Sequence, residues 1–106
     1  MENRIKDAEQ HGLLLLASLH EVGYKGTKRK LKKLIYATLD ALEQNYQQPG
    51  CDKLTEILAA ILFYYFNIAA EKGIVHRLKV PPNQDAIFKT VYTRLQERGE
   101  SFKHNE

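Results

Sequence analysis

The sequence predicts an all-α protein, a single-domain bundle of about four helices with an extended connector before the last helix. Apolar residues recur three and four positions apart, which is the spacing of one helix face. Glycine and proline clusters near positions 23–27, 47–50, 73 and 81–82 separate four such stretches. With 106 residues and 43% apolar residues, the chain has enough apolar surface for one core and is too apolar for disorder.

The first helix is expected over about residues 3–22. Its apolar residues at intervals of three and four are Ile5, Ala8, Gly12, Leu15, Leu19 and Val22. This seam predicts packing against another helix. Glycine lowers helix stability by about 1 kcal/mol relative to alanine, so Gly12 indicates the close approach of a neighbouring backbone.

The second helix is expected over about residues 28–46, with Thr27 as its N-cap. The residues expected on its buried face are Leu31, Leu34, Ile35, Thr38, Leu42 and Tyr46. The residues expected on its opposite face are Arg29, Lys33, Tyr36 and Asp40.

The third helix is expected over about residues 52–72 and ends at Gly73. It is the most apolar of the four, and its polar stripe is narrow, so we expect it to be central and most buried. Residues 74–80 form the connector, which has no evident strand partner. The last helix is expected over about residues 83–100, capped by Asn83, with a frayed tail over 101–106. Its expected buried residues are Ile87, Phe88, Val91, Tyr92 and Leu95, with Phe102 if the helix continues.

Positive charge is concentrated at the start of the second helix. The formal net charge of the chain is +3, from 16 Lys plus Arg against 13 Asp plus Glu. Six of the basic residues lie within nine positions, so the remaining ten basic and thirteen acidic residues balance to −3. The six are Lys25, Lys28, Arg29, Lys30, Lys32 and Lys33. Cations are unfavourable at a helix N-terminus because the free N–H groups and the helix dipole already make it positive.

An anion at this helix start would relieve the repulsion, and we interpret the cluster as a binding site for the nucleic-acid backbone. Tyr36, one turn beyond Lys32, is placed to stack on a base. The alternative is a solvated lysine-rich face that aids solubility. A helix-turn-helix formed by the first two helices is a sharper version of this interpretation, but Arg29 is the single candidate there for bidentate base contact. Non-specific phosphate contact, to DNA or RNA, is therefore favoured.

A second basic set follows later in the chain and would extend this surface if it lay beside the second helix. Its members are His76, Arg77, Lys79, Lys89, Arg94 and Arg98.

Apolar residues exceed what one core requires, which predicts a second interface. Ala60, Phe63 and Tyr64 lie at the polar stripe of the third helix, and leucines surround most of the first. The simplest partner is a second copy in a two-fold homodimer. Alternatively, the connector or the C-terminal segment covers these residues. A third interpretation is that Tyr64, Tyr65 and Phe66 line a pocket for an apolar ligand.

The common catalytic and cofactor-binding motifs are missing from the sequence. No P-loop, dinucleotide fingerprint, nucleophile elbow or pair of histidines with metal-ligand spacing is present. The lone Cys51 forms no internal disulfide, and no apolar run reaches the length of a membrane span. We therefore expect a cytoplasmic, non-enzymatic accessory subunit without metal, cofactor or membrane contact. Its partner is expected to be nucleic acid or, alternatively, an acidic protein or another protein bound through an exposed apolar face.

Overall fold

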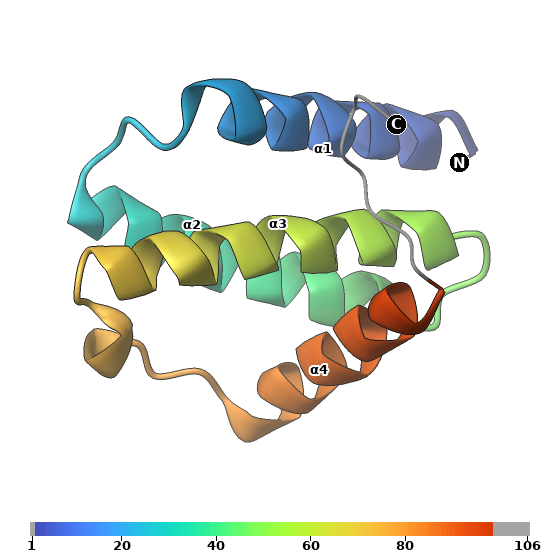
Figure 1. Cartoon of the computed structure of the whole chain (residues 1–106). Coiled ribbons are helices and arrows are strands. Elements are labelled where there is room, and N and C mark those ends of the chain that lie inside the picture. The colour runs from blue at the N-terminus through green and yellow to red at the C-terminus, as the bar shows by residue number, and fades with distance from the viewer. Residues whose placement is uncertain (1, 99–106) are drawn as a thin grey trace.

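The computed structural model describes residues 2–98 and confirms the all-α bundle (Figure 1). The four helices are α1 (Glu2–Val22), α2 (Lys28–Asn45), α3 (Asp52–Glu71) and α4 (Pro82–Glu97). The connector before α4 contains a short 3-10 helix, η1 (Val75–Arg77), which was not predicted, and no helix over residues 78–81. The expected tail over 101–106, Phe102 and the last residues of the fourth helix lie outside the described residues.

Helix α3 is the centre of the bundle, as its composition predicts. It packs against α1 on one side and against α2 and α4 on the other, and α2 also packs against α4. Figure 1 shows α1 above α3 and α4 crossing below it. Within residues 2–98, α3 is the only helix against which α1 packs. The helix-turn-helix that was considered is therefore not formed, because such a unit needs α1 and α2 to pack on each other.

Helix α1 fits closely onto α3 at Gly12. A β-carbon placed on Gly12 would lie 2.7 Å from Cγ2 of Ile57, so the expected close approach is confirmed. Leu19 is buried as predicted, but between it and Gly12 the buried residue is Leu16 and not Leu15, which is 40% exposed. Since α3 alone covers α1, only a narrow stripe is buried, and Val22 is left 56% exposed at the helix end.

Helices α2 and α4 are joined by a polar clamp. The buried side chain of Gln84 donates hydrogen bonds to Oδ1 of Asp40 and to Oε1 of Glu43, each at 2.8 Å. Asn83 Nδ2 donates to the other oxygen of Glu43 at 2.9 Å. Asn83 therefore does not cap α4, contrary to expectation. The helix starts at Pro82 instead, because proline has the φ angle of a first helical residue and lacks an N–H group.

The apolar composition of α3 follows from its position. By length and mean hydropathy, 1.3 over eighteen residues, it is the one helix between residues 2 and 98 apolar enough to cross a membrane. Half of that window is buried by the other helices, and the core helix of a bundle has the same composition as a membrane span. We attribute its hydropathy to the three helices packed around it.

Burial of Tyr65 in α3 makes the fold sensitive to high pH. Burial, and to a lesser extent Tyr24, raises the pKa of Tyr65 above its ordinary value of 10.0. The unfolded phenol then ionises at lower pH than the folded one. The contribution of the neutral Tyr65 to stability is therefore fully present below about pH 10 and is lost as pH rises above it. In urea unfolding between about pH 8 and 11.5, we expect Tyr65→Phe to lose less stability with pH than the unchanged protein. Parallel losses would contradict this.

Candidate nucleic-acid interface

The start of α2 is held by its own cap and by the loop before it. Thr27 is the N-cap, as predicted, and its Oγ1 accepts a hydrogen bond of 3.0 Å from the backbone N–H of Lys30. The Tyr24 hydroxyl donates to the Thr27 carbonyl at 2.7 Å. Gly26 lies directly against Tyr24, since an added β-carbon there would collide with the tyrosine hydroxyl. These contacts fix the direction in which the basic side chains leave the helix.

The end of α3 brings the connector to α2. Gly73 ends α3 with a φ of +72°, as predicted for a C-terminal stop. Its N–H donates to the Ala70 carbonyl at 3.1 Å, and the Ile74 N–H donates to the Ala69 carbonyl at 3.0 Å. This pair of hydrogen bonds is a Schellman motif, which reverses the chain after the helix. Ile74 is thereby turned into the core, and η1 follows it.

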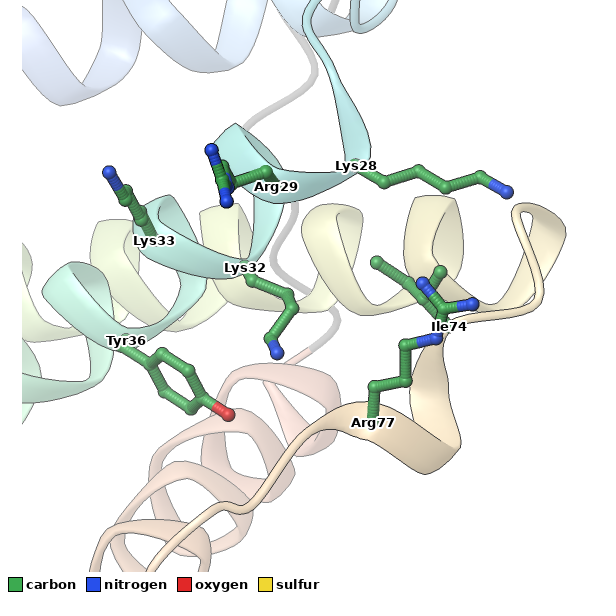
Figure 2. A pocket seen from close by; sticks show the side chains of 7 residues that line it. All are labelled: Lys28, Arg29, Lys32, Lys33, Tyr36, Ile74 and Arg77. Carbon is green, nitrogen blue, oxygen red and sulfur yellow. The ribbon is translucent and has the colours of Figure 1, made fainter.

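Between α2 and η1 lies an open hollow of about 360 Å³, which we call the basic hollow (Figure 2). The residues that line it are Lys28, Arg29, Lys32, Lys33, Tyr36, Ile74 and Arg77. Five of the seven residues predicted as the nucleic-acid site are thus brought together. The other two, Lys25 and Lys30, are exposed but do not line the hollow.

Arg77 is the residue that the sequence could not place. It belongs to the second basic set, and the structure puts it opposite the start of α2. Figure 2 shows Lys32 and Arg77 pointing into the space between α2 and η1. Two others of this set make ion pairs elsewhere: Lys89 with Asp85 at 3.0 Å, and Arg98 with Glu56. Of the second set, Arg77 therefore extends the predicted surface.

Tyr36 has a second role that was not expected from its predicted outward position. Its hydroxyl accepts a hydrogen bond of 2.9 Å from the backbone N–H of Lys79 in the connector. The ring is half-buried and forms one wall of the basic hollow. Tyr36 therefore fixes the connector to α2, and this contact holds the ring itself in one orientation.

The electrostatics of the basic hollow are one-sided. Five cations line it and no carboxylate does. The first turn of α2 contains no acidic residue. Each cation near the N-terminus of a helix costs about 0.3–1 kcal/mol relative to a neutral residue, and repulsion between neighbouring cations adds to it. An anion in the hollow would offset both.

Metal chemistry has no support in the part of the chain that the structure describes. No three His, Cys, Asp or Glu residues gather there in a group that could hold a metal ion. Cys51 is buried, with its Sγ 3.7 Å from Oδ1 of Asn45.

The predicted apolar interface of Ala60, Phe63 and Tyr64 is partly covered within the chain. The Phe63 ring stacks on Tyr92 of α4 with centroids 4.5 Å apart, and Phe63 remains 40% exposed. The Tyr64 hydroxyl donates to the Leu19 carbonyl of α1 at 2.5 Å. Ala60 is partly buried. Among the described residues, three other exposed apolar side chains, Leu14, Leu15 and Val22, lie on α1, and Val75 lies on η1.

The three aromatic residues considered for a ligand pocket are used in packing. Tyr65 is buried in the core, and Phe66 meets Phe88 of α4 edge-on at 5.3 Å between ring centroids. Tyr64 is held by α1, where His20 meets its ring edge-on at 5.1 Å.

Comparison with known proteins identifies no family for this chain. No family model matches the sequence, and no curated protein or solved structure matches it. The class of protein that the fold and the site define is an all-α bundle with a basic hollow between its second helix and its connector.

Proposed function

We propose that this protein is a small non-enzymatic accessory subunit that contacts the nucleic-acid backbone through the basic hollow and the lysines around it. One observation carries the proposal: five cations from two separate elements surround a single hollow whose lining contains no carboxylate. Clustered lysine and arginine side chains bind phosphates and release counterions from the nucleic acid, which gives affinity without base recognition.

The composition of the site favours phosphate contact over sequence reading. Specific base contacts are made mostly by arginine, asparagine and glutamine side chains that form two hydrogen bonds with one base edge. The lining holds three lysines and only two arginines, Arg29 and Arg77. We therefore propose binding to DNA or RNA with little sequence preference and a strong dependence on salt.

The test is a titration of the protein into labelled random-sequence oligonucleotides, single- and double-stranded, at about 50 and 200 mM salt. We expect binding that weakens steeply with salt. Arg29→Glu combined with Lys33→Glu removes two cations and adds two anions at the rim, and we expect it to abolish binding at the higher salt concentration.

The matched control is Lys6→Glu combined with Lys53→Glu, which changes the net charge equally at exposed positions outside the cluster. We expect this control to retain most of the affinity. If both pairs of substitutions weaken binding equally, or if neither does, the basic hollow is not the binding site. If the unchanged protein does not bind at low salt, the proposed function is wrong.

A second candidate function, as a protein-interaction module or homodimer, is favoured by one observation on α1. Leu14, Leu15 and Val22 are large apolar side chains that α3 does not cover. Exposed apolar side chains that lie together mark protein interfaces more often than solvent-facing surfaces. If the oligonucleotide titration shows no binding, this face of α1, with Phe63, becomes the surface to test, and the lysines become a site for an acidic partner.

A further inference from the structure

We infer that the basic hollow takes one nucleotide of a single-stranded nucleic acid, with its phosphate between Lys32 and Arg77 and its base against Tyr36. The inference rests on the proposed function, and it adds which form of nucleic acid binds and how.

The shape of the site argues for a flexible strand. A duplex keeps its bases stacked inside and presents convex backbones, so its phosphates would meet the rim of a hollow without entering it. A single strand can turn one nucleotide outward and into a recess. The volume of about 360 Å³ lies at the small end of the range for ligand pockets, which suits one small group.

The chemistry of the lining suits a ligand that is anionic at one end and apolar at the other. Lys32 and Arg77 supply positive charge inside the hollow (Figure 2). Tyr36 supplies an aromatic wall, and Ile74, which is 1% exposed, adds a small aliphatic part of the lining. A bare phosphate would use only the cations, whereas a nucleotide uses both parts, because its flat base packs on an aromatic ring.

The apolar walls are already in place before any ligand binds. The hydrogen bond of 2.9 Å from the Lys79 N–H holds the Tyr36 hydroxyl, and the Schellman motif after α3 holds Ile74. Affinity is therefore not reduced by the ordering of these two side chains on binding.

Three of the lining cations lie at the edge of the hollow, and they indicate that the nucleotide belongs to a strand. Figure 2 shows Arg29 and Lys33 directed away from the hollow along α2, and Lys28 extending past Ile74. A free mononucleotide would leave these three side chains without a phosphate. A strand continues on both sides of the bound nucleotide, and its neighbouring phosphates reach them.

The test compares three ligands with equal numbers of phosphates: a labelled single strand, an abasic strand and a duplex. By fluorescence anisotropy, we expect the single strand to bind at least about fivefold tighter than the abasic strand, the lower end of the gain from stacking one base. Tyr36→Leu should remove this preference and keep the salt dependence. Tyr36→Phe, which keeps the ring and loses the hydrogen bond to Lys79, should retain the preference.

Four results would overturn the inference. Equal, salt-dependent binding of the single strand, abasic strand and duplex would refute it and leave the proposed function standing. Loss of the preference in Tyr36→Phe as well would show that the tyrosine acts by holding the connector. Competition by a nucleoside monophosphate at the same concentration as the strand would make a free nucleotide the ligand. If no oligonucleotide binds at low salt, the proposed function and the inference both fail.

Discussion

Replacing Lys32 by glutamate is expected to weaken oligonucleotide binding about 10- to 100-fold at 0.1 M salt without any loss of stability. For a single strand, each phosphate contact contributes about fivefold to affinity at that salt concentration. The substitution removes the contact made by Lys32, and the new carboxylate would repel a phosphate held by Arg77 in the same hollow. Two contacts are thus weakened through one change, and for a single strand the slope of log affinity against log salt should fall by up to about 1.4.

The free energy of unfolding of Lys32→Glu should not fall together with its affinity. The unchanged protein holds like charges on both sides of the hollow, whereas Lys32→Glu places a negative charge among the remaining cations. Exposed ion pairs contribute about 0 to 1 kcal/mol, so the free energy of unfolding in urea should stay equal or rise by that amount. If Lys32→Glu loses binding without losing stability, the lysine does not serve the fold. The clustered cations are then retained for ligand binding.

Lys53→Glu, on the exposed side of α3 near its N-terminus, is the control for the change in net charge. It should leave the affinity nearly unchanged. The explanation fails if Lys32→Glu binds as well as the unchanged protein. It also fails if the loss of affinity is accompanied by a comparable loss of stability, because the lysine would then be structural.

The part of the site that could be predicted is the part that is local in sequence. Lys28, Arg29, Lys32 and Lys33 lie on consecutive turns of one helix, and the Thr27 cap fixes where that helix starts. Helical periodicity alone is enough to place them near one another. Arg77 lies more than forty positions later, and its place beside α2 depends on the turn at Gly73 and on the packing of Ile74. Neither follows from the spacing of charges.

The incorrect predictions about the fold also arose from contacts between residues that are distant in sequence. Both Leu15 and Leu16 fit an interval of three or four from Gly12, and the choice between them depends on which helix covers α1. Asn83 is a good capping residue by type, but its side chain is used by Glu43 of α2. In both cases a tertiary neighbour decided between local structures of similar energy.

The packing of α1 on α3 gives the largest expected effect on stability. Gly12→Val is expected to destabilise the protein by at least about 2 kcal/mol, within the range for overpacked cores. Even a single added β-carbon would lie 2.7 Å from Cγ2 of Ile57. Ile57 is fully buried, and its branched side chain has one strongly preferred rotamer in a helix, so it has little room to move.

The matched change on α3 should reverse this effect. Ile57→Ala alone leaves a cavity and is expected to cost about 2–5 kcal/mol. In the double variant, valine at position 12 adds the same number of carbons that alanine at position 57 removes. Volume-conserving exchanges cost less than about 1.5 kcal/mol, so the double variant should be more stable than Ile57→Ala alone. A double-mutant cycle measured by urea unfolding gives the coupling directly. If the two losses simply add, Gly12 and Ile57 are not in contact, and the close approach of α1 to α3 does not explain why a glycine occupies the middle of this helix.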